Sequence, residues 1–187
     1  IDIVGVAQTG AGKTFAYLLP ILRLYKFSHD RDPKVLILVP TRELVLQQVA
    51  EVEKLTKYMN IRVAGVYGGT NINTQKLSVM EGLDILIATP GRLRDLGLSG
   101  ALKLKSIRKL VIDEVDEMLN LGFRPQLERI FELMPKKRQN ILFSATLTPE
   151  IEKLLTDYFE FPHKIEIAPH GTPLDQIIQK GYHVPNF

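Results

Sequence analysis

Short, unbroken runs of apolar residues recur along the chain, and they predict buried β-strands. Hydrophobicity that is continuous rather than alternating is typical of parallel strands covered on both faces. The runs are Ile3–Val6, Val35–Val39, Val63–Val66, Ile85–Ala88, Leu110–Ile112 and Ile141–Phe143.

Segments with the apolar spacing of helices lie between these runs. Their apolar residues recur at i, i+3, i+4 and i+7, which places them on one helix face. Alternating strands and helices predict an α/β sheet with right-handed crossovers, and Pro20 should kink the first helix at Leu19. The spacing is seen at Phe15, Leu18, Leu19 and Leu22, at Leu127, Ile130, Phe131 and Met134, and at Ile151, Leu154, Leu155 and Tyr158.

A cluster of polar, charged or glycine residues follows each apolar run. Because ligands of open parallel sheets bind outside the carboxyl ends of the strands, we expect all of these clusters on one edge. In chain order they are Ala7–Thr14, Pro40-Thr41-Arg42, Gly68-Gly69, Thr89-Pro90-Gly91-Arg92, Asp113-Glu114 and Ser144-Ala145-Thr146.

The first cluster has the features of a phosphate-binding loop between a strand and a helix. Gly10 and Gly12 permit positive φ angles, so that backbone N–H groups can surround a phosphate, and the helix dipole adds to the attraction. Lys13 would reach the β- and γ-phosphates, and the Thr14 hydroxyl would face Mg²⁺. The strict pattern has Gly where Ala7 stands, so the alternative is a plain turn with a surface lysine.

Asp113 and Glu114 favour the phosphate-binding interpretation. Adjacent carboxylates after a buried strand are unfavourable unless they meet a cation or a reacting water. Asp113 fits the anchoring of Mg²⁺, and Glu114 fits the positioning or deprotonation of an attacking water. The alternative is an ordinary acidic loop. Asp116 is expected to bridge to Ser144 or Thr146.

Two further clusters predict binding of a polyanion. Thr41 and Thr89 each precede a predicted helix that has an arginine, Arg42 or Arg92, in its first turn. The positive end of the helix dipole disfavours a cation there unless an anion binds. The alternative is that the two arginines pair with nearby acids such as Glu43 and Asp95.

Other residues near these clusters suggest recognition of a nucleic-acid backbone rather than of bases. Gly68-Gly69 would allow close approach of a sugar–phosphate chain, or it is a bare turn. Tyr67 is the single aromatic candidate for stacking, and we expect it to pack instead. Recognition would then be independent of base sequence.

Composition limits the remaining possibilities. A chain of 187 residues with 45% hydrophobic residues is long enough for one buried domain. It has no cysteine, which excludes disulfides and thiolate metal sites and fits a reducing, cytoplasmic location. Its apolar runs are too short for a membrane span, and a net charge of +3 is compatible with a polyanionic partner.

Taken in order, the motifs resemble those of the first RecA-like domain of a DEAD-box RNA helicase, over essentially the whole chain. The resemblance implies a three-layer RecA-like α/β fold, ATP and Mg²⁺ as cofactors, and RNA as a partner. It departs from the family pattern at Ala11, where Ser or Thr is usual, and at Val115, where Ala is usual. Residues 113–123 are most similar to bacterial members.

The resemblance also assigns roles to residues. Catalysis falls to Lys13, Asp113, Glu114 and Asp116, and coupling of nucleotide state to strand separation falls to Ser144, Ala145 and Thr146. The nucleotide would contact Gln8, Thr9, Gly10, Ala11, Gly12, Lys13, Thr14, Asp113 and Glu114, with Mg²⁺ on Thr14 and Asp113. RNA would contact Pro40, Thr41, Arg42, Gly68, Gly69, Thr89, Pro90, Gly91 and Arg92.

The glycines and prolines of residues 170–187 predict a linker with one strand near 177–184, and the resemblance implies a RecA-like domain over residues 1–169. The adenine-reading Q motif would precede Ile1, and a second RecA-like domain of the same protein would follow Phe187. We expect a monomer that binds no membrane and, as a fragment, hydrolyses ATP poorly. The competing hypotheses are a DNA-directed helicase or translocase and an RNA clamp that uses ATP only as a switch.

Overall fold

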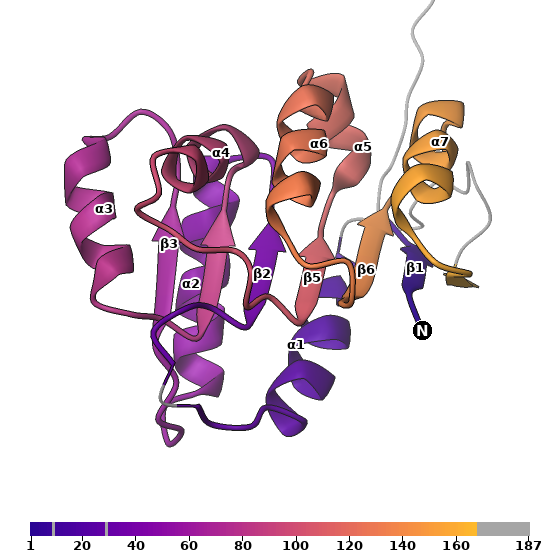
Figure 1. Ribbon diagram of the computed structural model, residues 1–187. Coiled ribbons are helices and arrows are strands. Elements are labelled where there is room, and N and C mark those ends of the chain that lie inside the picture. The colour runs from indigo at the N-terminus through magenta and orange to yellow at the C-terminus, as the bar shows by residue number, and fades with distance from the viewer. Residues whose placement is uncertain (9, 29, 168–187) are drawn as a thin grey trace, which may run out of the picture.

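The computed structural model describes residues 1–8, 10–28 and 30–167, in which a seven-stranded sheet is covered by helices on both faces (Figure 1). Every pair of neighbouring strands is parallel, in the order β3-β4-β2-β5-β6-β1-β7. The predicted α/β class is therefore confirmed. Along the chain the elements are β1 (Ile3–Val6), α1 (Lys13–Arg23), β2 (Val35–Leu38), α2 (Arg42–Leu55), β3 (Val63–Val66), α3 (Ile72–Met80), β4 (Ile85–Ala88), α4 (Pro90–Leu98), β5 (Lys109–Ile112), α5 (Val115–Asn120), α6 (Arg124–Leu133), β6 (Gln139–Ser144), α7 (Pro149–Tyr158) and β7 (His163–Glu166).

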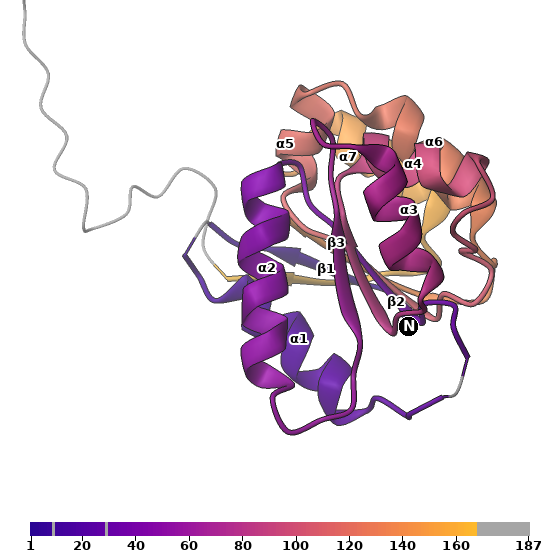
Figure 2. The same cartoon turned by 90° about the vertical axis from the view of Figure 1, so that its left-hand side faces the viewer.

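Successive strand residues pack into two separate cores, which explains why the apolar runs are unbroken. In β2, Val35 and Ile37 pack in the core beneath α1 and α2, whereas Leu36 and Leu38 pack in the core beneath α3–α7. Figure 2 shows α1 and α2 on one side of the sheet and the other helices on the opposite side. A parallel strand covered on both faces has no solvent-facing position, so none of its positions favours a polar residue.

Six strands match the predicted runs, and the differences lie where hydrophobicity is weak. The edge strand β7 was not predicted because all four of its residues are exposed. Helix α3 was not predicted because its apolar residues do not form one buried face: Leu77 and Met80 are exposed, and Val79 is the buried residue of the helix. The predicted linker and the strand near 177–184 lie outside the described residues. The described helices are all too short or too polar for a transmembrane passage.

The predicted apolar face of α1 is partly wrong. Leu18 and Leu22 are buried as expected, but Phe15 and Leu19 are exposed, and Tyr17 and Ile21 complete the buried face instead. The periodic spacing selected a face that is rotated toward solvent, because it ignored Tyr17. Helical geometry continues through Pro20 to Arg23, and the bend at Leu19 stays a prediction.

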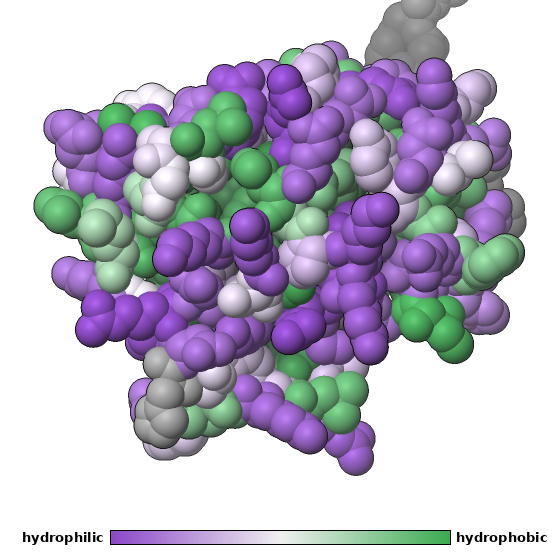
Figure 3. All heavy atoms as spheres, in the orientation of Figure 1, coloured by the Kyte–Doolittle hydropathy of each residue, from purple (hydrophilic) through white to green (hydrophobic). Residues whose placement is uncertain are grey.

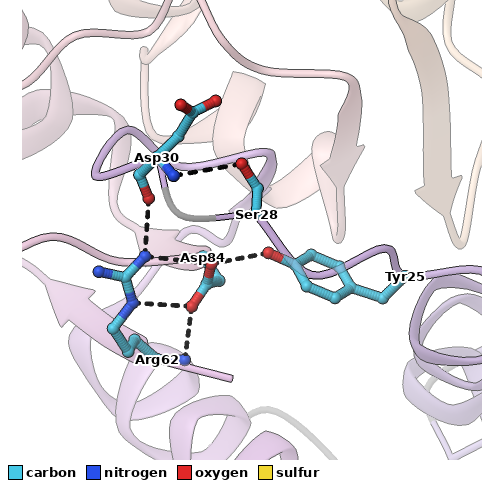
Figure 4. A network of polar contacts seen from close by, with 5 residues as sticks. All are labelled: Tyr25, Ser28, Asp30, Arg62 and Asp84. Carbon is cyan, nitrogen blue, oxygen red and sulfur yellow. Dashed lines mark hydrogen bonds and ion pairs between the residues drawn. The ribbon is translucent and has the colours of Figure 1, made fainter. Parts of the chain in front are cut away.

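A polar network fixes the amino-terminal ends of β3 and β4 (Figure 4). Asp84 has 2% of its surface exposed, and its carboxylate accepts hydrogen bonds from the Arg62 backbone N at 2.8 Å, from Arg62 Nε at 2.9 Å and from Tyr25 Oη at 2.7 Å. Burial alone would raise the pKa of Asp84, but the bonds from Arg62 and Tyr25 outweigh it and hold the pKa below its usual value.

Replacing Asp84 by Asn should lower the free energy of unfolding at pH 7 by about 2 kcal/mol, because a buried and paired charge is lost while Arg62 keeps partial access to water. A lowered folded-state pKa stabilises the fold above the unfolded value of about 4 and loses that effect as pH falls through the folded-state pKa. The gap between wild type and variant in urea unfolding should therefore narrow below about pH 4. Asp95→Asn, which removes an exposed ion pair with Arg94, should change little, and equal losses in the two variants would contradict the assignment.

Candidate functional site

The strand order divides the predicted clusters into two groups along one edge of the sheet, the upper edge in Figure 1. Strands β5, β6 and β1 are neighbours, so Asp113, the Ser144–Thr146 segment and the loop before Lys13 lie together. Strands β3, β4 and β2 bring together the clusters that follow them. The expectation that all six clusters lie on one edge is met, because all the strands are parallel.

The loop between β1 and α1 has the backbone geometry of an open cradle. Gly10 and Gly12 have φ angles of +85° and +77°, and a Cβ added to either would meet no atom within 4 Å. The Ala7 backbone N donates to the Ser144 carbonyl at 3.0 Å, which ties the loop to the end of β6. Helix α1 begins at Lys13, whose side chain is buried. Thr9 lies outside the described residues.

Asp113 is a buried carboxylate with one unpaired oxygen. Its Oδ2 accepts hydrogen bonds from Tyr17 Oη at 3.2 Å and from Gln48 Nε2 at 3.3 Å. Its Oδ1 has no hydrogen-bond partner among the described residues, and neither does Gln48 Oε1. Burial raises the pKa of Asp113, while the charge of Lys13 and the Tyr17 hydrogen bond oppose the rise.

These unpaired oxygens belong to residues that line a cavity of about 560 Å³, which Lys13 and Thr14 also line. The residues present fit Mg²⁺, since this cation prefers oxygen ligands and is usually held by one or two carboxylates together with substrate phosphates.

Glu114 lies between this cavity and a second one. It has a φ of +55°, a left-handed conformation that is strained for a residue with a side chain. Glu114 and Lys13 line both cavities, and the second, of about 430 Å³, is also lined by Thr41 and Asp116. Burial, followed by the neighbouring charge of Asp113, raises the pKa of Glu114. Of the two adjacent carboxylates, Asp113 therefore lines the first cavity alone, whereas Glu114 lines both.

Asp116 links the end of β5 to the segment after β6. Its Oδ2 accepts hydrogen bonds from the backbone N of Ala145 at 3.1 Å and of Thr146 at 3.2 Å, and from Thr146 Oγ1 at 3.3 Å. The predicted bridge to Thr146 is present. The Ser144 hydroxyl instead accepts from the Thr146 backbone N at 3.4 Å.

Arg92 is held by neutral acceptors. Its guanidinium donates to Gln75 Oε1 and to the Thr70 carbonyl, both at 2.7 Å. Gln75 also donates to Thr70 Oγ1 at 2.9 Å and to the Tyr67 carbonyl at 3.2 Å. The alternative of an ion pair with Asp95 is wrong, because Asp95 pairs with Arg94.

Arg42 lies at the exposed start of α2, with its guanidinium 5.0 Å from the centre of the Tyr67 ring. Tyr67 is half-buried against the core beneath α1 and α2, so the expectation that it packs is met. Among the described residues, no ion pair joins Arg42 to Glu43.

Both helices of this group begin where the sequence predicted. Thr41 Oγ1 accepts from the Leu44 backbone N at 3.3 Å, whereas Thr89 occupies the cap position of α4 without a side-chain bond. Three of the predicted RNA-contacting residues are buried: Pro40, Thr89 and Pro90. The side chains that reach solvent at this part of the edge therefore belong to the other predicted residues, such as Arg42.

Residues 1–154 match the family model described as DEAD/DEAH box helicase. The chain belongs to this family. A DEAD-box ATP-dependent RNA helicase, CshA of Streptococcus pneumoniae, is 40% identical over 89% of this chain and 32% of its own length. The chain therefore spans about a third of the length of this curated relative.

Solved structures of DEAD-box proteins have the same architecture. The yeast splicing factor Prp28 matches with a TM-score of 0.85 and 38% identity over 92% of this chain and 42% of the Prp28 chain. A DEAD box protein from the hyperthermophile Methanococcus jannaschii matches with a TM-score of 0.83 and 36% identity over 88% of this chain and 45% of its own. The RecA-like fold class expected for a DEAD-box domain is thereby confirmed.

Three residues that contact the DEAD-box motifs were not singled out from the sequence: Tyr17, Gln48 and Gln75. Gln48 carried a signal, because it is a polar residue between the buried Val45 and Val52 of α2. Tyr17 and Gln75 had none, since a buried tyrosine in an apolar stripe and a glutamine on a polar helix are both ordinary.

Asp113→Asn should raise the free energy of unfolding at pH 7 by about 1 kcal/mol when nucleotide and Mg²⁺ are absent, as is common when a destabilising functional group is replaced. A carboxyl whose folded-state pKa is raised disfavours the fold above that pKa and has no such effect below the unfolded value of about 4. The gain should therefore disappear in acid. Urea unfolding of wild type and variant measures it, with Glu43→Gln on the exposed face of α2 as the control, and a loss of stability at pH 7 would contradict the prediction.

Proposed function

We propose that this chain is the ATP- and RNA-binding domain of an ATP-dependent RNA helicase that couples ATP binding and hydrolysis to local separation of RNA strands. The observation that carries the proposal is the unpaired oxygen of buried Asp113 in the cavity lined by Lys13, on the same sheet edge as Arg42 and Arg92. The name of the CshA relative supports the assignment. Residues 1–169 would form the domain and 170–187 would lead to a second RecA-like domain of a monomeric cytoplasmic protein.

In the proposed nucleotide site, the backbone N–H groups of Gln8, Gly10, Ala11 and Gly12 would surround the phosphates, and Thr9, outside the described residues, is a further proposed contact. The helix dipole of α1 and the charge of Lys13 favour the β- and γ-phosphates. Thr14 and Asp113 would hold Mg²⁺, which would neutralise charge on the phosphates. Glu114 would orient the attacking water and accept its proton.

The raised pKa of Glu114 suits the role of a base, since proton acceptors work best when their pKa approaches the working pH. The hydrogen bonds from Ala145 and Thr146 to Asp116 would couple the γ-phosphate side of the site to the second cavity, with Ser144 completing the coupling segment. Thr41 lines that cavity and directly precedes Arg42, so the nucleotide and RNA residues would meet there.

RNA would bind through its backbone at the starts of α2 and α4. Phosphate oxygens can replace the neutral acceptors that now hold Arg92, and a charged acceptor gives the stronger hydrogen bond. The proposed contacts are Pro40, Thr41, Arg42, Gly68, Gly69, Thr89, Pro90, Gly91 and Arg92, of which the buried Pro40, Thr89 and Pro90 would contribute through their backbone.

The nucleotide roles are tested by RNA-stimulated ATP hydrolysis of the full-length protein. Lys13→Ala should weaken nucleotide binding and turnover together. Glu114→Gln should keep nucleotide binding but lower turnover by about 10²- to 10⁴-fold, the usual contribution of a positioned base. Lys153→Ala, an exposed change on α7, is the control. Unchanged turnover in Lys13→Ala or Glu114→Gln would remove the assigned roles, and binding without turnover in the wild type would favour an ATP-switched clamp.

The RNA role is tested with Arg92→Ala and its neighbour Arg94→Ala. Arg94 lies on the same helix but pairs with Asp95 at the surface. Arg92→Ala should weaken binding to RNAs of different sequence equally and reduce the slope of log K against log salt by about one, whereas Arg94→Ala should leave both unchanged. A loss confined to one RNA sequence would contradict backbone recognition, and preference for DNA in competition would favour a DNA-directed enzyme.

A further inference from the structure

A second cavity region lies at the opposite edge of the sheet, where the strands begin. One cavity of about 290 Å³ opens between the end of α1, the segment before β2 and the start of β5. Its apolar walls come from Ile21, Leu24 and Val35. Nothing in the proposed nucleotide or RNA site uses these residues.

The rim of this cavity is strongly cationic. Four basic residues line it: Lys26, Lys34, Arg108 and Lys109. One acidic residue, Asp30, forms an ion pair with Lys34 at this rim. Four cations and one acid give a local excess of +3. Lys109 donates to the neutral Gln139. Among the described residues, the side chains of Lys26 and Arg108 have neither an ion pair nor a hydrogen bond.

Tyr25 separates this cavity from a neighbouring one of about 310 Å³ that Phe27, Met59 and Ile61 line. The network in Figure 4 fixes this wall, because Tyr25 Oη donates to Asp84 and Asp84 is held by Arg62. The two cavities are therefore preformed on either side of a fixed ring, and little ordering is needed before a ligand binds.

Apolar side chains around the two cavities are exposed. Leu24, Phe27 and Met59 have 64%, 53% and 40% of their surface exposed, respectively. In Figure 3, some hydrophobic side chains are visible at the lower end of the molecule, with hydrophilic ones between them. An exposed apolar patch rimmed by charges is a common feature of protein-binding sites.

We propose that this surface, formed by the two cavities and their basic rim, docks an acidic peptide segment of a partner protein. Two large apolar side chains of the segment fill the cavities on either side of Tyr25, and flanking carboxylates bind Lys26, Lys34, Arg108 and Lys109. The charge excess selects an acidic occupant, and the apolar walls select side chains rather than nucleobases.

Because this surface and the nucleotide site lie at opposite ends of the strands, the partner can bind without covering Lys13 or Arg92. Binding should therefore be independent of nucleotide and RNA. This separates the proposal from the proposed function, so that either can fail alone.

The test uses a short fluorescein-labelled peptide in which a Phe and a Leu lie between two clusters of glutamates, titrated against the purified chain by fluorescence anisotropy. Arg108→Glu and Leu24→Ser should each weaken binding about tenfold, since one introduces a like charge and the other removes an exposed apolar wall. Lys153→Glu is the control with the same charge change on the far side of the sheet, and it should leave binding unchanged. A matched peptide with lysines in place of the glutamates should not bind.

Other results would overturn the proposal. These are no binding of the acidic peptide, binding that Arg108→Glu and Leu24→Ser leave unchanged, or equal binding of the lysine peptide. An oligouridylate that binds the wild type and is lost in Arg108→Glu, with no acidic peptide binding, would assign the surface to RNA. Self-association abolished by Leu24→Ser, again without peptide binding, would assign it to a second copy of the chain.

Discussion

The uniform direction of the seven strands is the constraint on which the rest of the molecule depends. It places every strand's carboxyl end on one edge, where short loops and helix starts leave backbone N–H groups unpaired. It also requires apolar cover on both faces, so polar groups are confined to the two edges. Buried aspartates at the two edges differ in how completely their carboxylate oxygens are hydrogen-bonded.

Three buried aspartates illustrate this difference. At the edge where the strands begin, Asp2 accepts hydrogen bonds from Asn140 and from the Glu160 backbone N, and Asp84 is bonded to Arg62 and Tyr25. At the opposite edge, Asp113 is also buried but keeps one oxygen unpaired, and burial raises its pKa. A carboxylate with all its partners stabilises the fold, whereas the incompletely paired Asp113 would bind a cation under the proposed function. Burial alone would not separate these roles, because the aspartates are about equally inaccessible.

The sequence was sufficient to predict those parts of the structure that hydrophobicity or the conformational freedom of glycine determines. The six apolar strands, the starts of α2 and α4 and the positive φ angles of Gly10 and Gly12 all follow from local chemistry. Contacts between segments distant in the chain could not be predicted in the same way. The bonds of Tyr17 and Gln48 to Asp113 depend on how α1 and α2 lie on the sheet, and the left-handed Glu114 depends on the turn from β5 into α5. The exposed β7 is held by pairing with β1, which no pattern of its own residues reveals.

Helix α2 connects the two halves of the carboxyl edge. It begins at Arg42, which lies over Tyr67, and less than two turns later Gln48 donates to Asp113. Val45 between these contacts and Val52 one turn after Gln48 bury one face of the helix, and a packed helix moves as a unit more readily than it bends. Under the proposed function, a displacement of α2 by RNA at Arg42 would alter the hydrogen bond at Oδ2 of Asp113. Because Oδ1 of the same carboxylate has no other partner, the position of the metal-binding oxygen would then depend on a helix that begins in the RNA site.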